Sequence, residues 1–252
     1  MTKQIIILLL FIVNASWAQK VSINNDIVLN EFATLPYLIP VGITKANVLV
    51  ELDEKVDTIG VELDSLHRII KIEHFDLKCK IVYKLNSIIK YYEVPFPNYF
   101  LSSCHSFITK YQLGKDGYII SSTTKCYTED TSRKNKVIEL SYETVKAKNS
   151  LITSVTMVAP VQENQDSYQL IAYDKVINLM YFNYSTNSYR LIYSIDKVRN
   201  KYNFNLKSRF SRARINCIYY NYNIDKNFAG LFQTALYNVS GDRIGKLSII
   251  KR

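Results

Sequence analysis

The chain of 252 residues carries 32 Lys and Arg against 22 Asp and Glu, which gives a formal net charge of +10 at pH 7. A hydrophobic content of 48% is ordinary for a folded protein, and only 7 Gly and 5 Pro exclude a collagen-like or linker-rich chain. The excess of basic over acidic residues favours anionic partners, namely acidic polysaccharides, lipid head groups or an acidic protein.

The first 18 residues have the three-part pattern of a secretory signal peptide. Lys3 provides a basic start, the range 5–13 is an unbroken apolar run, and small residues stand on either side of Trp17 before Gln19. The apolar run is much shorter than the roughly 20 residues of a membrane-spanning helix. We therefore expect cleavage after Ala18, a single β-rich domain over residues 19–252, and no transmembrane segment after signal removal.

Export decides how the partners and the cysteines are interpreted. The protein is expected in the periplasm, secreted or at the cell surface, where nucleic acid is not an expected partner. In an oxidising compartment four cysteines permit two disulfides, and free thiols stay an open alternative. The candidates for disulfides are Cys79, Cys104, Cys126 and Cys217.

Along the mature chain, residues 21–30 suggest a strand or an ordered arm, and Pro36 and Pro40 then interrupt regular structure. Residues 44–56 fit a short helix or a strand equally well. Farther on, apolar and polar residues alternate, which is the period of antiparallel strands with unlike faces. The clearest alternating segments are 138–143, 189–195, 218–225 and 231–239.

Many predicted strands end in a recurring pattern, in which an apolar residue, any residue and a second apolar residue precede a turn pair. Tyr83-Lys-Leu-Asn-Ser87 and Tyr193-Ser-Ile-Asp-Lys197 are two copies. Asp, Asn, Ser and Gly tolerate turn geometry, so each copy predicts a strand end and a tight turn. The sequence therefore predicts an all-β fold of repeated antiparallel hairpins, in an open or stacked sheet, with a β-propeller-like arrangement as the alternative.

Three of these segments resemble the tyrosine–aspartate (YD, Rhs-type) repeats of bacterial exported and surface proteins. They are the ranges 63–72, 111–120 and 237–244, and the glycine expected in the turn occurs near Gly117 and Gly241. The resemblance implies β-hairpin units that serve as scaffold, and it brings no catalytic residues with it.

The strongest local charge feature is a basic stretch with no acidic residue between Asp196 and Asp225. Arginine forks match the oxyanions of phosphate, sulfate and carboxylate groups, so this stretch is the predicted contact surface. A solvated strand edge is the alternative. The residues that we expect to bind a ligand are Lys201, Arg209, Arg212, Arg214 and Tyr219.

An acidic stretch over residues 51–64 lacks the spaced loop of a calcium site, so neither a metal nor another cofactor is predicted. No nucleotide-binding or nucleophile motif occurs in the sequence, and no catalytic residue is predicted. The favoured interpretation is an exported, non-enzymatic binding or scaffold protein of the envelope or the medium. A carbohydrate-active hydrolase on a β-scaffold and a protein–protein interaction module are the alternatives.

Overall fold

A computed structural model describes the greater part of the chain after residue 33. The described residues are 34–75, 77–93, 104–128, 137–147, 150–159, 167–173, 176–183, 188–196, 199–207, 214–220, 225–226 and 231–252. The predicted signal peptide at residues 1–18 and the predicted strand or arm at residues 21–30 lie outside them.

The described chain contains one short 3-10 helix and 17 strands. The helix is η1 (Leu35–Tyr37). The strands are β1 (Lys45–Leu52), β2 (Lys55–Leu63), β3 (Ile69–His74), β4 (Leu77–Tyr83), β5 (Ser87–Glu93), β6 (Cys104–Leu113), β7 (Ile119–Thr128), β8 (Val137–Ala147), β9 (Ser150–Ala159), β10 (Ser167–Tyr173), β11 (Val176–Asn183), β12 (Ser188–Asp196), β13 (Lys201–Lys207), β14 (Arg214–Tyr220), β15 (Asp225–Lys226), β16 (Phe232–Tyr237) and β17 (Arg243–Lys251). Within the described part of the chain, no helix has the length and apolar character of a membrane span.

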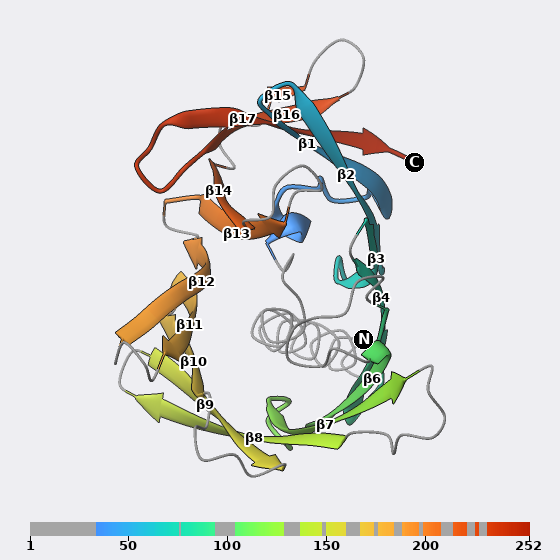
Figure 1. The fold of residues 1–252 in the computed structure, drawn as a ribbon, viewed down its shortest axis with the longest axis vertical. Helices are drawn as coiled ribbons and strands as arrows, with labels where there is room; N and C mark the ends of the chain where they lie inside the picture. Colours follow the sequence, from blue (N-terminus) through green and yellow to red (C-terminus); the bar gives the residue numbers. More distant parts are fainter. Residues whose placement is uncertain are drawn as a thin grey trace, which may run out of the picture.

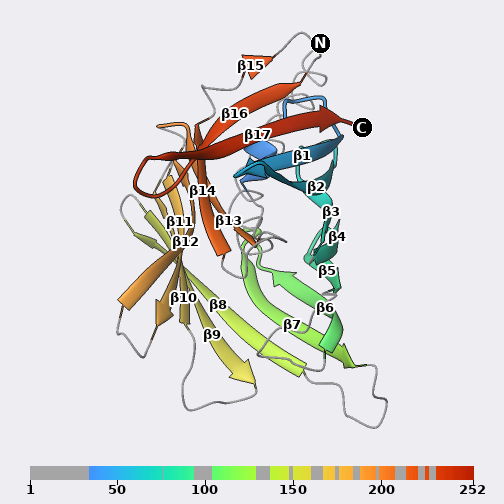
Figure 2. The ribbon, with the colours of Figure 1, turned by 45° about the horizontal axis from the view of Figure 1, so that its top comes forward.

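The strands form one sheet whose pairing returns to its start. From β1 to β13 each strand pairs antiparallel with the next, β14 pairs with β16, β16 with β17, and β17 with β1. The first and last long strands therefore lie side by side, as Figures 1 and 2 show. The prediction of an all-β fold of antiparallel hairpins is confirmed, and the circuit adds that the hairpins join into a ring.

The sequence of residues 44–56 fits a short helix or a strand equally well. In the structure these residues form most of the β1–β2 hairpin. The hairpin has a two-residue turn, and Asp53 and Glu54 both have positive φ angles, of 48° and 63°. Positive φ at both turn residues matches the right-handed twist of the paired strands, so this short connection suits a hairpin.

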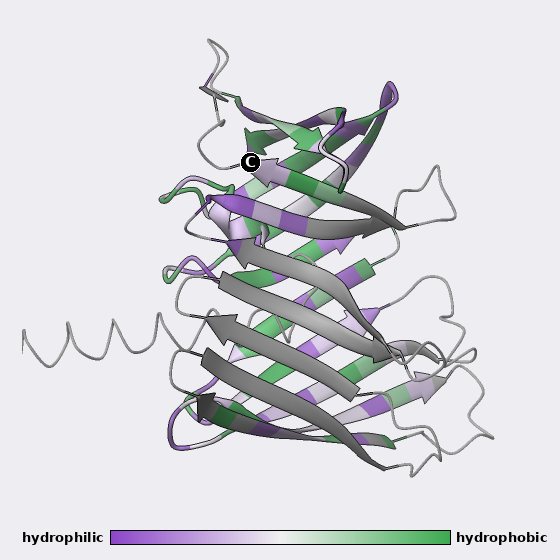
Figure 3. Ribbon diagram, turned by 90° about the vertical axis from the view of Figure 1, so that its left-hand side faces the viewer, coloured by the Kyte–Doolittle hydropathy of each residue, from purple (hydrophilic) through white to green (hydrophobic). Residues whose placement is uncertain are grey.

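Alternation along the strands gives the ring two different faces, and Figure 3 shows hydrophobic and hydrophilic residues following one another along the described strands. In β1 the side chains of Ala46, Val48 and Val50 are at most 1% exposed, whereas those between them are partly exposed. Their partners in β2, and the partners of Val48 and Val50 in β17, are buried as well, because paired residues share a face. Burial of each such aliphatic side chain contributes about 1.5–3 kcal/mol, so the apolar face forms the core.

The core is completed by a segment that we call the strap, residues Thr34 to Ile39, which includes η1. In Figure 1 the strap lies inside the ring of strands, beside β13 and β14. Leu35, Leu38 and Ile39 are at most 3% exposed and belong to the same core cluster as the inner side chains of β1, β2 and β17. The buried face of the sheet is therefore the inner face, and the half-exposed face is the outer one.

Three hairpin turns have the same geometry, and they are the turns of the segments that resemble YD-type repeats. In each, the first residue donates its N–H to the carbonyl of the fifth, and the fourth donates its N–H to the carbonyl of the first. The fourth residue has a positive φ angle in all three turns. These turns are Asp64–Arg68, Gly114–Tyr118 and Asn238–Asp242, and their left-handed residues are His67, Gly117 and Gly241.

Candidate functional site: a hollow and a lysine-bearing outer face

The structure separates the residues of the basic stretch. Lys201 begins β13 and Arg214 begins β14, and the register pairs Lys201 with Tyr220 and Lys207 with Arg214. Lys201 and Arg214 thus lie at opposite ends of one hairpin, roughly 20 Å apart at the usual rise of a strand. Arg209 and Arg212 lie outside the described residues, so their part in a contact surface stays a prediction.

Tyr219 does not lie on a contact surface, contrary to the sequence prediction. Its side chain is fully buried, and its hydroxyl donates a hydrogen bond of 2.6 Å to the carbonyl of Thr34 in the strap. Its ring stacks on Tyr202, with ring centres 5.2 Å apart, and Tyr202 stacks on Tyr37 of the strap. Burial raises the pKa of Tyr219 well above its usual value. Because alternate residues of β14 face inward, Tyr219 belongs to the core.

The four cysteines fall into different states. Cys126 is disulfide-bonded, whereas Cys79 and Cys217 form no disulfide and lie on the inner face, 4% and 0% exposed. Burial raises the pKa of Cys79 and raises that of Cys217 to about 12. Cys104 lies in β6, and its side chain is outside the described residues. A disulfide bond is therefore present in the fold, and two thiols have a packing role.

The acidic stretch is divided between the two faces. Asp57 in β2 is 4% exposed and faces inward, whereas Glu62 in the same strand faces outward. Glu51 on the outer face forms an ion pair with Lys246 of β17, at 3.1 Å. No group of three or more metal-ligating side chains occurs among the described residues, so this part of the chain presents no candidate metal site.

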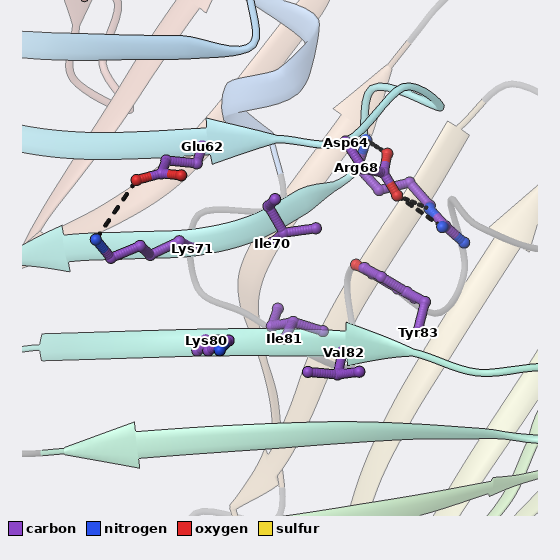
Figure 4. A pocket seen from close by; sticks show the side chains of 9 residues that line it. All are labelled: Glu62, Asp64, Arg68, Ile70, Lys71, Lys80, Ile81, Val82 and Tyr83. Carbon is purple, nitrogen blue, oxygen red and sulfur yellow. Dashed lines mark hydrogen bonds and ion pairs between the residues drawn. The ribbon is translucent and has the colours of Figure 1, made fainter.

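A hollow of about 520 Å³ lies on the outer face where β2, β3 and β4 meet the turn Asp64–Arg68. Figure 4 shows the side chains around it, with Lys80 and Val82 on β4 and Ile70 and Lys71 on β3. The hollow is lined by Glu62, Asp64, Arg68, Ile70, Lys71, Lys80, Ile81, Val82 and Tyr83. It therefore combines apolar walls with three cations and two carboxylates.

Both carboxylates of the hollow are bound by cations of the protein. Glu62 pairs with Lys45 at 3.3 Å and with Lys71 at 3.4 Å, and Asp64 pairs with Arg68 at 2.6 Å. Lys71 also bonds Glu73 at 2.9 Å, and this hydrogen bond raises the pKa of the Lys71 ammonium. Both carboxylates of the hollow are thus engaged in ion pairs within the protein.

Lys80 differs from the other cations of the hollow. Its side chain is exposed, and no ion pair joins it to any described residue. The register places it directly opposite Lys71, and like charges opposite one another on a sheet are destabilising. Lys71 is already paired with Glu62 and Glu73, so Lys80 is the cation of the hollow that no described carboxylate pairs with.

The positive charge continues across neighbouring strands. One outer row of register partners runs from Lys80 through Tyr91 and Ile108 to Lys125. Lys110 is next to this row on β6, and all three lysines are exposed. Tyr91 is 41% exposed between Lys80 and Ile108. We call Lys80, Tyr91, Lys110 and Lys125 the lysine face; it spans β4 to β7, about 14 Å at the usual strand spacing.

The lysine face forms no basic run in the sequence, because its members are far apart in the chain. Charge density along the sequence pointed to the basic stretch, whereas the lysine face is assembled by the register of four strands. The alternation of apolar and polar residues within each strand was the available signal, because it places Lys80, Lys110 and Lys125 on the polar face of the sheet. The neighbouring strands could be aligned only after their register was known.

The chain was also compared with known proteins. No family model matches it, and no curated protein matches it, so the resemblance to YD-type repeats stays a prediction. Among solved structures the fold is similar to that of a porin-like protein from Bacteroides vulgatus, with a TM-score of 0.40 and 10% sequence identity. That similarity covers 83% of this chain and 98% of the other.

Proposed function

We propose that this chain is an exported, non-enzymatic binding protein and that its lysine face binds an acidic polysaccharide. The observation that carries the proposal is the register row in which Lys80, which has no ion pair to a described residue, is followed by the exposed ring of Tyr91 and by Lys125. The signal-peptide pattern supports export, because the compartment beyond the inner membrane is where such polymers are met.

The spacing of the charges favours a repeating anion over a compact one. The three lysines lie on different strands, so their ammonium groups are spread over the face and do not converge on one point. Ammonium groups act as point charges without a fixed geometry, which suits carboxylates or sulfates repeated along a flexible polymer. The ring of Tyr91 adds a flat apolar surface on which a sugar ring can stack while its hydroxyl remains in water.

The same face is less suited to a bilayer. Its intervening apolar residues, Ile89 and Ile108, are only partly exposed, so few apolar side chains are available to enter a lipid surface. Anionic lipid head groups share the charge of the polysaccharide but present it on a plane. Binding to lipid without binding to polysaccharide is therefore an outcome that contradicts the proposal.

The test measures binding of the purified mature protein to polygalacturonate, with neutral dextran as the uncharged comparison. The triple variant Lys80→Ser, Lys110→Ser, Lys125→Ser should bind about tenfold more weakly at low salt, because exposed charge pairs at about 0.5 kcal/mol each sum to about 1.5 kcal/mol. Raising the salt concentration should weaken binding by the unmodified protein, since exposed charges are screened.

The matched control replaces three exposed lysines outside the lysine face, as Lys84→Ser, Lys115→Ser, Lys251→Ser. It removes the same net charge and should leave most of the affinity in place. Equal weakening by both triples would show a nonspecific charge effect and overturn the assignment to the lysine face. Binding only to vesicles of equal phosphatidylcholine and phosphatidylglycerol would overturn the proposal that the ligand is an acidic polysaccharide.

A further inference from the structure

We propose that the strap positions the hollow from inside the ring and that His67 is the positioning residue that connects the two. The inference rests on the proposed function, because the hollow contains Lys80, the first residue of the lysine face. The physical link is the turn Asp64–Arg68, whose side chains reach both faces of the sheet. His67 reaches the strap, and Asp64 and Arg68 line the hollow.

On the inner side, the ring of His67 holds two carbonyl groups of the strap. Its Nε2 atom lies 2.8 Å from the carbonyl oxygen of Pro36 and 2.9 Å from that of Ile39. Carbonyl oxygens only accept hydrogen bonds, so Nε2 carries the hydrogen and donates it to both. The strap itself is held by apolar burial and by Tyr219 on the opposite wall, which makes it a firm support for His67.

On the outer side, the carboxylate of Asp64 organises the turn. One of its oxygens accepts the backbone N–H groups of Leu66 and Arg68, at 3.0 and 2.9 Å. The other oxygen accepts from Nε of Arg68 at 2.8 Å and pairs with its terminal nitrogen. The guanidinium then lies 3.9 Å from the ring centre of Tyr83, which closes one side of the hollow. A shift of His67 would therefore displace groups that shape the site.

The backbone at His67 is an independent sign that its side chain matters. His67 has a φ angle of 62°, in the left-handed region where a side chain is disfavoured. The equivalent positions of the two other turns are occupied by Gly117 and Gly241, which adopt this conformation at little cost. Among these three turns, a side chain stands at this position only where the turn lies between the strap and the hollow.

The first variant is His67→Asn, because Asn tolerates the left-handed conformation but its short amide does not span both carbonyl groups. His67→Gly is the second variant; it keeps the backbone preference of the other two turns. We expect either to weaken polygalacturonate binding about three- to tenfold, the usual size of a coupling effect. Gly241→Asn is the matched control, since it places the same residue at the equivalent left-handed position of the turn Asn238–Asp242, where an added Cβ meets nothing within 4 Å, and it should leave the affinity within about twofold.

Hydrogen exchange gives a readout that a merely structural role would not move selectively. The amides of Leu66 and Arg68 should exchange faster in the His67 variants and at the unmodified rate in Gly241→Asn. If the unmodified protein does not bind polygalacturonate, the proposed function fails, and the exchange rates still decide whether His67 holds the turn. Normal affinity together with unchanged exchange in both His67 variants would overturn the inference.

Discussion

The basic stretch of β13 and β14 and the lysine face of β4 to β7 teach different lessons about charge in a sheet. The basic stretch is dense in sequence, but its hairpin places Lys201 and Arg214 at opposite ends and directs Tyr219 inward. The lysine face is sparse in sequence, and strand register brings its members together. In a β-protein, the side chains that share a surface are therefore set by the rows across strands more than by runs along the chain.

The largest difference between the two regions is expected from their tyrosines. Tyr219→Ala should lower the free energy of unfolding by about 3–5 kcal/mol, the range for losing a large aromatic side chain from a packed core. Tyr91→Ala should leave stability within about 0.5 kcal/mol, as is usual for surface substitutions, and weaken polysaccharide binding instead. Urea unfolding followed by tyrosine fluorescence measures both. Similar destabilisation by the two variants would contradict the assignment of Tyr219 to the core and of Tyr91 to the surface.

A second prediction compares the charges of the two regions. The triple variant Arg209→Ser, Arg212→Ser, Arg214→Ser should change the affinity for polygalacturonate by less than about threefold, whereas the lysine-face triple loses about tenfold. Titration of both variants under one salt condition provides the measurement. A greater loss in the arginine variant would move the binding site to the basic stretch, where the sequence first placed it.

The third prediction concerns the hydrogen bond by which Tyr219 of the basic stretch holds the strap. Tyr219→Phe removes the hydroxyl that donates to Thr34 and leaves a buried carbonyl without that donor. We expect a loss of about 1 kcal/mol in the free energy of unfolding, because hydrogen bonds of this kind contribute about that much. The midpoint of urea unfolding reports it. No change in the midpoint would mean that packing alone holds the strap.

The smallest expected effect concerns Cys217, on the inner side of the basic stretch. Its pKa in the folded protein is raised from 9.0 to about 12, so the folded state keeps the proton more tightly than the unfolded state does. The resulting stability is fully present below pH 9 and is lost as the pH rises toward 12. From pH 8 to 9.5 the loss should be about 0.8 kcal/mol relative to Cys217→Ala. An identical pH dependence in the two proteins would contradict the assignment.

Much of the fold could be predicted from alternation, and much of the site could not. The alternating residues of β8, β12 and β16 correctly indicated antiparallel strands, and the turn pattern located the hairpins at Asp64, Gly114 and Asn238. Closure of the ring depends on the pairing of β1 with β17, two segments at opposite ends of the described chain. A long-range pairing of this kind leaves no local pattern in either strand.

The position of the strap could not be predicted either, because it also depends on contacts between distant parts of the chain. Pro36 and Pro40 correctly marked an interruption of regular structure, but an interruption does not show where the chain then lies. The apolar residues of the strap were buried by contact with strands far along the chain, including β14 and β17. The role of His67 was hidden for a related reason, because its partners lie about thirty residues earlier in the sequence.

Protection of lysines by the bound polysaccharide is the strongest test of binding at the lysine face. The protein is treated with an amine-acetylating reagent with and without saturating polygalacturonate, and each lysine is quantified by mass spectrometry. We expect slower acetylation of Lys80, Lys110 and Lys125 in the complex, and unchanged acetylation of Lys84, Lys115 and Lys251. Protection of the second set, or equal protection of both sets, would contradict it.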